Sequence, residues 1–329
     1  MKSGGLCRKI KQAIYRVSAK CRNGKDGWLM RNKGPFFVLL CYLMWGVLPI
    51  FWKTLAAVDS FYVLTCRVVW SMVFLAVILA VQRRFHVVRA VVANRKELGC
   101  LVLSGAFVCV NWGLYIWAVN SDHMLDASLA YYMNPILAIL LGTIVFREKL
   151  TRLQWLSVLV TFTGIVVTVI RSGQIPWIAL IVGGCFAVYG ALKKNITVDS
   201  AVSVFVETIC LTPVALIIMI VFDLRGTGAV GVLHGWQWLL LPMAGVATTL
   251  PLLCFSKGVQ TTPLTLTGVL MYVNPTIQLL LSVWLYHEEF TTTYAILFGF
   301  VWGGLVLYVI SSFLEERKRR KEEEELSCV

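Results

Sequence analysis

The chain has 329 residues, of which 58% are hydrophobic and only 14% are charged. A soluble domain of this size carries about 25% charged residues, so the composition excludes an ordinary water-soluble protein. The net charge is +13, and the basic residues lie in the two terminal regions and a few loops, with acidic residues mixed into the C-terminal run. No basic face interleaved with aromatic residues occurs, which excludes a nucleic-acid partner.

Ten apolar segments follow one another in chain order, each near the length of about 20 residues that crosses a bilayer. They predict an all-α integral membrane protein with ten transmembrane helices and short connections. The segments are 35–56, 61–82, 98–119, 126–146, 153–170, 176–192, 200–222, 236–256, 263–286 and 293–313.

Lysine and arginine predict how these helices are oriented. With the N-terminus inside the cell, 26 of the 30 fall on the inner side, three (Lys53, Arg171 and Arg225) fall outside, and Arg67 lies within a helix. Such an asymmetry is the positive-inside pattern. It predicts that both termini are cytoplasmic.

Residues 1–33 form a basic N-terminal region without the apolar core of a signal peptide. Three interpretations stay open: a disordered cytoplasmic tail, an amphipathic helix on an anionic leaflet, or a translation start at Met30. Residues 314–329 are predicted to form a charged cytoplasmic C-terminal tail.

The chain contains an internal repeat with an offset of 140 residues. The offset brings Val58-Asp59-Ser60 onto Val198-Asp199-Ser200 and Asn134-Pro135 onto Asn274-Pro275, and Glu148 onto Glu288. Between 129 and 172, 12 of 44 positions are identical to their counterparts. The repeat predicts two five-helix units, at 34–172 and 173–313.

Five helices are an odd number, so the two units enter the membrane from opposite sides. Inverted repeats of this kind are typical of secondary transporters, whose solute site lies between the halves near the midplane. The alternative is a duplicated membrane scaffold with another role.

Asn134-Pro135 and Asn274-Pro275 lie about 12–15 Å inside their helices, near the midplane. Proline removes a backbone hydrogen bond, and the freed carbonyls of Tyr131 and Met271 need protein, water or a ligand as a partner. We predict kinked helices that line a central cavity. The alternative is a packing kink. The residues predicted to bind solute here are Tyr131, Tyr132, Asn134, Tyr272 and Asn274.

Asn111, Trp112 and Tyr115 make the third helix rich in amide and aromatic groups, and they are predicted to line the same cavity. Arg67 in the second helix and its counterpart Glu207 in the seventh are charged groups within the membrane, which are functional candidates. We predict that they serve gating or coupling, Arg67 toward the outer mouth and Glu207 toward the inner one, without touching. The alternative is snorkelling or a structural hydrogen bond.

The sequence lacks a Walker loop, HExxH, GxSxG and flavin motifs, and its ten cysteines show no metal-ligand spacing. We therefore expect no catalytic residues, no metal and no cofactor. An intramembrane enzyme remains the alternative, but His123 and His287 fall in predicted outer loops without an evident catalytic partner. Gly164, Gly303 and Gly304 favour close helix packing or a homodimer contact.

Several stretches resemble RarD-type permeases, in the EamA branch of the drug/metabolite transporter superfamily. Thr65–Ser71 is similar to the pattern HRVxWS, with Cys66 in place of His. Asn111–Asn120, His123–Leu129 with Asn134-Pro135, Trp45-Gly46 and Pro251–Phe255 also resemble that family.

The resemblance covers about residues 34–313. It implies ten helices in two repeats and a cavity surrounded by helices one, three, four, six, eight and nine. Together, these features predict a secondary transporter of a small metabolite or drug-like solute in a bacterial inner membrane. Its partners would be the solute, the lipid bilayer and a coupling proton or exchanged solute.

Overall fold

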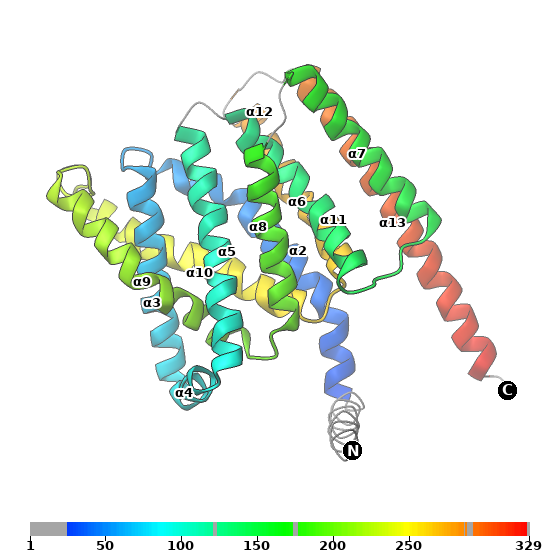
Figure 1. Ribbon diagram of the computed structural model, residues 1–329, viewed down its shortest axis with the longest axis horizontal. Coiled ribbons are helices and arrows are strands. Elements are labelled where there is room, and N and C mark those ends of the chain that lie inside the picture. The colour runs from blue at the N-terminus through cyan, green and yellow to red at the C-terminus, as the bar shows by residue number, and fades with distance from the viewer. Residues whose placement is uncertain (1–24, 121–123, 174–176, 286, 288–291, 328–329) are drawn as a thin grey trace, which may run out of the picture.

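The computed structural model describes residues 25–120, 124–173, 177–285, 287 and 292–327, and these form a bundle of helices (Figure 1). The helices are α2 Lys25–Lys53, α3 Ser60–Val81, α4 Phe85–Ala93, α5 Arg95–Asn120, α6 Met124–Ile144, α7 Arg152–Ser172, α8 Trp177–Asn195, α9 Ser200–Leu224, the 3-10 turn η1 Gly235–Leu239, α10 Leu240–Val259, α11 Leu264–Met271, α12 Val273–Trp284 and α13 Thr292–Ser327.

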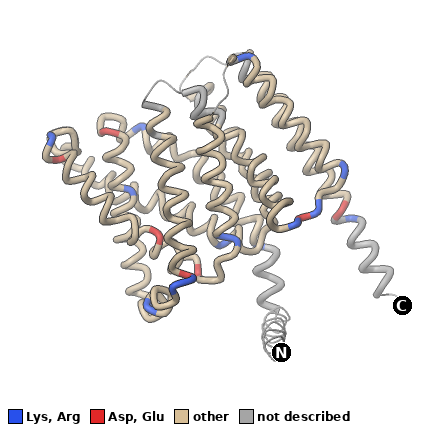
Figure 2. The backbone as a smooth tube through the Cα atoms, viewed as in Figure 1, with Lys and Arg blue, Asp and Glu red and all other residues tan. Residues whose placement is uncertain are grey.

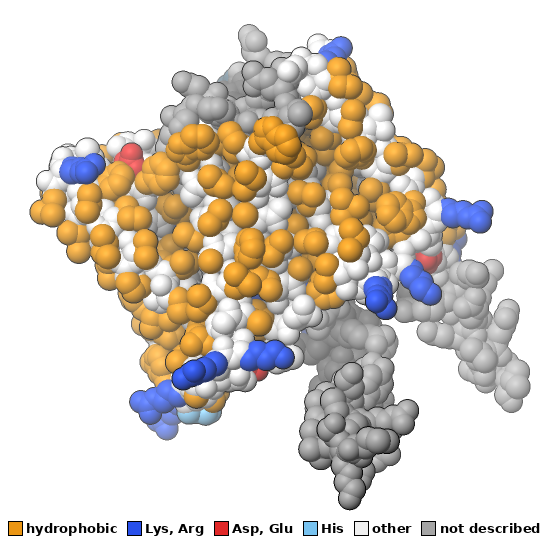
Figure 3. All heavy atoms as spheres, in the orientation of Figure 1, with side chains coloured by type: hydrophobic (Ala, Val, Ile, Leu, Met, Phe, Trp, Pro, Cys, Tyr) orange, Lys and Arg blue, Asp and Glu red, His pale blue; other side chains and the backbone are white. Residues whose placement is uncertain are grey.

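Nine spans within the described residues are long and apolar enough to cross a membrane, with α11 and α12 together forming one of them. The shorter apolar run Ala130–Ile144 of α6 supplies the tenth. The prediction of an all-α membrane protein with ten transmembrane helices is confirmed. The outer surface agrees, because large apolar side chains such as Ile217 and Leu224 are 62% and 82% exposed, and apolar side chains spread over the visible face (Figure 3).

Equivalent positions of the two repeats play the same local role. The Asp59 carboxylate accepts the backbone N–H of Phe61 at 2.8 Å and caps the N-terminus of α3. The Asp199 carboxylate accepts the N–H of Ala201 at 3.1 Å and caps α9. Packing follows the same symmetry: α3 lies against α10, and its counterpart α9 lies against α5.

The fifth and tenth spans, α7 and α13, pack against each other at one side of the bundle (Figure 1). Gly304 allows the close approach, because a Cβ there would stand 2.8 Å from the carbonyl oxygen of Ser157 and would also meet Thr161. Gly164 likewise faces Phe300. These two glycines therefore serve a contact within the chain. The homodimer stays a prediction.

The described N-terminus at Lys25 and the end of α13 lie at one end of the bundle, here called the terminal end (Figure 1). Lysine and arginine gather there (Figure 2), as the predicted cytoplasmic side requires. Helix α2 begins at Lys25 and α13 continues to Ser327, so both run into the predicted tails. Residues 1–24 lie outside the described part, and with them most of the basic N-terminal region.

One helix was not predicted from the sequence, and one of the predicted kinks is a full break. Helix α4 is a short amphipathic helix between the second and third spans, and Arg84, just before it, pairs with Asp199 at 3.1 Å. The ninth span is interrupted at Tyr272, where α11 ends and α12 begins. Pro275 explains the interruption, because it has no N–H to offer the carbonyl of Met271.

Candidate functional site

A cavity of about 410 Å³ lies inside the bundle, a size usual for a small-molecule site. It is bordered by α2, α3, α5, α6, α8, α11 and α12, together with the α2–α3 turn. Its lining consists of Tyr42, Trp45, Leu48, Pro49, Trp52, Leu55, Ala56, Val58, Ser60, Val63, Arg67, Asn111, Trp112, Tyr115, Ala130, Tyr131, Asn134, Val182, Phe186, Met271, Asn274 and Gln278.

The cavity lies toward the end of the bundle opposite to the terminal end. Its lining includes Ala56 and Ser60, which are exposed at the turn between α2 and α3. The family resemblance implies a border that includes the eighth span, but α10 contributes no lining residue among those described. Helix α3 lies at the border instead, with α10 behind it, where Gly245 is in close contact with Trp70.

The two Asn-Pro pairs bring Asn134 and Asn274 to the cavity from equivalent places in the two repeats. Asn274 Oδ1 accepts a hydrogen bond from Gln278 Nε2 at 2.9 Å. Asn134 Oδ1 is buried and, within the described part of the chain, has no hydrogen-bond partner, and the same holds for the Tyr42 hydroxyl. Buried polar atoms of this kind normally have a partner, so both atoms are unsatisfied at the wall of the cavity.

The predicted aromatic and amide residues of α5 also reach the cavity. Asn111 Nδ2 donates to the carbonyl of Val182 at 2.7 Å, which ties α5 to α8. Tyr115 and Tyr131 meet edge to face with ring centroids 5.2 Å apart. Together with Trp112, these residues place four of the predicted side chains on the cavity wall.

Tyr132 and Tyr272 are located elsewhere, although they were predicted to bind solute with the others. Both are buried in an apolar cluster with Phe298 of α13. The Tyr272 hydroxyl donates to the backbone carbonyl of Tyr132 at 3.4 Å, so the two repeat partners contact each other. Neither residue is among those that line the cavity. Their position links the α6 backbone to the broken ninth span.

Arg67 projects into the cavity from α3. Its Nε donates to Thr248 Oγ1 at 2.8 Å. The guanidinium lies 4.4 Å from the ring centroid of Trp52 and 4.8 Å from that of Trp112. Two indole rings therefore stabilise this cation by cation–π contacts.

Glu207 is buried away from the cavity. Its Oε1 lies 2.6 Å from Lys193 Nζ and accepts a hydrogen bond from Ser104 at 2.9 Å. Lys193 also donates to Ser203 at 2.7 Å. Arg67 and Glu207 each interact with other partners, and no contact between them occurs among the described interactions.

Aromatic rings close the cavity toward the terminal end. Trp45 and Phe186 line it, and Phe255 lies against both, with centroid distances of 6.0 and 5.5 Å. Tyr189 stacks on Phe255 at 5.6 Å, and Lys193 Nζ lies 5.6 Å from the Tyr189 ring. The buried Lys193–Glu207 pair thus continues the barrier below the aromatic rings.

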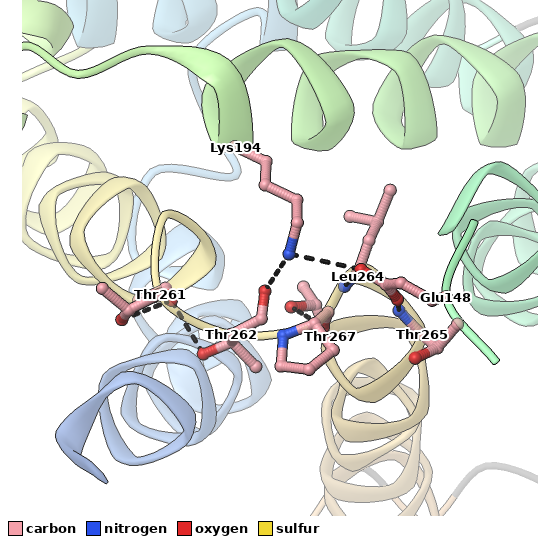
Figure 4. A network of polar contacts seen from close by, with 9 residues as sticks. Glu148, Lys194, Thr261, Thr262, Leu264, Thr265 and Thr267 are labelled. Atoms are coloured by element: carbon pink, nitrogen blue, oxygen red, sulfur yellow. Dashed lines mark hydrogen bonds and ion pairs between the residues drawn. The ribbon is translucent and has the colours of Figure 1, made fainter. Parts of the chain in front are cut away.

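A second polar group closes the terminal end, where α8 meets the α10–α11 connection. Figure 4 shows Lys194 reaching from α8 to the carbonyl of Thr262 and to Glu148, at 2.6 and 3.3 Å. Glu148 in turn accepts the backbone N–H groups of Leu264 and Thr265, both at 2.8 Å, at the start of α11. We call Glu148, Lys194, Thr262, Leu264 and Thr265 the terminal-end network.

Glu148 is the ionisable centre of this network. Burial alone would raise the pKa of its carboxyl group. The backbone N–H groups of Thr265 and Leu264, with the Lys194 ammonium, outweigh burial and hold the pKa below its ordinary value. The carboxylate is therefore ionised at neutral pH.

The sequence reasoning missed several of these residues. Gln278 stands one helical turn after Asn274 and could have been found from that spacing. Glu148 was noted in the repeat but assigned no role. Trp45 was noted as part of the family resemblance but assigned no role, while Trp52 and Phe186 resemble ordinary apolar helix residues.

Comparisons with known proteins agree on one family for this chain. The model of the EamA-like transporter family matches twice, at residues 32–170 and 175–310. A Vibrio cholerae protein named "Uncharacterized transporter" is 39% identical over 280 residues, covering 85% of this chain and 92% of its own. "Protein RarD" of Escherichia coli K12 is 34% identical over 287 residues, covering 87% and 97%. A crystal structure with 16% identity aligns with a TM-score of 0.64 over 85% of this chain and 98% of its own, which supports the fold alone.

Proposed function

This chain belongs to the EamA-like transporter family, and on that premise we propose that it is a secondary transporter that works by alternating access. It is a multi-pass membrane protein whose relatives are named as transporters. The proposed cargo is a small solute that binds in the cavity between the two repeats, in the inner membrane of a bacterium with both termini in the cytoplasm.

The observation that carries this proposal is a cavity that reaches one end of the bundle and is closed toward the other. Ala56 and Ser60 are exposed at its open end. Toward the terminal end, aromatic rings, the Lys193–Glu207 pair and the terminal-end network follow one another. This is the arrangement expected for one of the two states of an alternating-access carrier.

The closing contacts are of a kind that can separate and re-form. Lys194 donates to the carbonyl of Thr262, Glu148 accepts the N–H groups at the start of α11, and the two side chains form an ion pair, with no covalent constraint. The break at Tyr272 separates α11, which Glu148 holds, from α12, which carries Asn274. Because α11 and α12 are not one continuous rigid helix, α11 is free to move away from α8 while α12 stays in place.

In this proposal amide and aromatic residues contact the solute from three spans, and Arg67 contacts it from a fourth, α3. Asn111, Trp112 and Tyr115 act from α5 and Tyr131 and Asn134 from α6, while Asn274 acts from α12. Tyr132 and Tyr272 act indirectly by positioning the backbones of those helices. Arg67 faces the solute at the open side, and Glu207 with Lys193 serves gating or coupling on the closed side.

Counterflow tests the transport mechanism. The full chain in proteoliposomes is loaded with one unlabelled solute from a panel of small carboxylates, amides and amines, and uptake of the same labelled solute is followed. A carrier must show faster labelled uptake when unlabelled solute is inside, because the return step is then loaded. Uptake by protein-free vesicles is subtracted as background. If the remaining uptake is the same with and without unlabelled solute inside, the carrier mechanism is excluded.

The predicted orientation needs a separate experiment. In a cysteine-free background, Ser60→Cys should react with an impermeant maleimide from outside the cell, and Ser200→Cys only after the membrane is opened. These serines begin α3 and α9 at equivalent positions of the repeats. Labelling of both from the same side would contradict the inverted topology.

A further inference from the structure

Arg67 stands out among the cavity residues because it is a cation without a carboxylate partner. It lies within the membrane span Ser60–Val81, where a charged side chain is costly unless it pairs or faces a polar cavity. Among the described residues, it donates one hydrogen bond to Thr248, lies over the rings of Trp52 and Trp112, and is close enough to the Tyr131 hydroxyl to interact with it electrostatically. The described ion pairs do not include it.

The geometry leaves the binding edge of the guanidinium available. A guanidinium has five N–H donors in one plane, and the bond to Thr248 uses Nε alone. Trp52 and Trp112 contact the guanidinium through their ring faces, which offer no lone pair to its N–H groups. None of the hydrogen bonds among the described residues uses the four N–H groups of the two terminal nitrogens, and Arg67 lines the cavity.

The other lining residues give the cavity a distinct electrostatic character. Its remaining polar groups are neutral amides and hydroxyls, such as those of Asn111, Asn134 and Tyr131, and no Asp or Glu is among the lining residues. Arg67 therefore supplies the formal charge of the described cavity wall. Trp45, Leu48 and Phe186 form an apolar surface that continues from this charged site.

We propose that the solute is a small organic anion, with a carboxylate bound to the Arg67 guanidinium and an apolar body against the aromatic side of the cavity. This inference rests on the proposed transport function and adds the chemical class of its substrate. Paired N–H donors in a plane match the two oxygens of a carboxylate. A protonated amine would meet a like charge at Arg67 and no carboxylate on the wall.

The first experiment measures binding to the purified wild-type chain with three probes of nearly equal shape: phenylacetate, phenylacetamide and phenethylamine. Binding is followed by tryptophan fluorescence, because Trp52 and Trp112 contact Arg67. Charge-assisted hydrogen bonds contribute about 1.5–3 kcal/mol, so phenylacetate should bind about 10- to 100-fold more tightly than phenylacetamide. Phenethylamine should bind most weakly. Acetate and indole-3-acetate extend the series to smaller and larger carboxylates.

Two variants locate the discrimination. Arg67→Gln should reduce the ratio between phenylacetate and phenylacetamide to about one. Arg225→Gln removes the same charge from an exposed position at the end of α9 and should leave the ratio unchanged. A thermal melt confirms that each variant is folded, and the wild-type ratio decides the question if Arg67→Gln fails to fold.

The outcomes separate this inference from the transport mechanism. If wild type binds the amide or the amine as tightly as the carboxylate, or binds no carboxylate of the series at millimolar concentration, the anion proposal is wrong. Counterflow of an amide but of no carboxylate would support the carrier mechanism and contradict the anion-binding role of Arg67. Binding of carboxylates without counterflow would support the anion-binding role of Arg67 and contradict the carrier mechanism.

Discussion

The substitution Glu148→Gln should open the terminal end of the cavity. The wild-type carboxylate accepts the N–H groups of Leu264 and Thr265 through its two oxygens and pairs with Lys194. Glutamine keeps one acceptor oxygen, but it turns an NH₂ donor toward the other backbone N–H and removes the negative charge. The side chain keeps its size, so packing is preserved while the closing contacts weaken.

The size of the effect follows from these contacts. One charge-assisted hydrogen bond contributes about 1.5–3 kcal/mol, and a partly exposed ion pair adds about 0.5 kcal/mol. Some of this is recovered when Lys194 and the N–H group find water. A net loss of about 2 kcal/mol from the closed state shifts the ratio of open to closed molecules by about 30-fold.

The assay follows a cysteine placed inside the closed barrier. Gly190 on α8 faces Leu264 and Phe255, each 3.5 Å from a Cβ at that position, which is ordinary van der Waals contact, so Gly190→Cys places its thiol at the contact between α8 and α11. In a cysteine-free background, its thiol reacts with maleimide only when α8 and α11 separate. Glu148→Gln should increase the labelling rate by about the same 30-fold factor.

The matched control is Glu97→Gln, which removes a carboxylate near the start of α5. Its side chain is in none of the described hydrogen bonds or ion pairs, so the labelling rate should equal that of the parent. A Glu148→Gln protein that is folded and yet labels at the parental rate would refute the closing role of the terminal-end network.

Three further predictions concern stability. The pKa of Glu148 is held low despite its burial, so the ionised carboxylate stabilises the folded protein above about pH 5 and loses this effect as the pH falls through the folded-state pKa. The melting-temperature difference between wild type and Glu148→Gln should therefore shrink below about pH 4. Lys193→Met alone leaves Glu207 buried and unpaired, at a cost of about 3–5 kcal/mol in the unfolding free energy, whereas Lys193→Met with Glu207→Leu should recover most of it; equal losses would contradict the pair. Gly245→Ala places Cβ 2.5 Å from the Trp70 backbone and should lower the melting temperature, while Gly113→Ala, with nothing within 4 Å, should leave it unchanged or raise it.

The helices could be predicted from sequence because a bilayer imposes one strong requirement on length and polarity. An apolar run of about 20 residues has few alternatives to a spanning helix. The amphipathic α4 was missed because a helix of nine residues at the surface follows no such rule. A kink was predicted at both Asn-Pro pairs, but the ninth span breaks completely at Tyr272 while α6 runs through Pro135 as one helix.

In the candidate site, too, some residues could be predicted from the sequence and others could not. Asn111, Asn134, Asn274 and Arg67 could be found because polar groups within a span need a partner or a cavity. Tyr132 was placed on the wrong side of its helix, because adjacent residues point about 100° apart and the amphipathic pattern of α6 is weak. The ion pair of Glu207 with Lys193 joins α9 to the end of α8, and such a contact depends on three-dimensional packing. The binding roles of these residues remain predictions.

The opposite charges of Arg67 and Glu207 bear on the ancestry of the fold. The two residues occupy equivalent positions in halves that share one architecture. A symmetric dimer of single five-helix subunits would carry the same residue at both positions, either two guanidinium groups or two carboxylates. Once the gene was duplicated, each position could acquire its own charge, so the electrostatic difference between the two halves of this protein depends on that duplication.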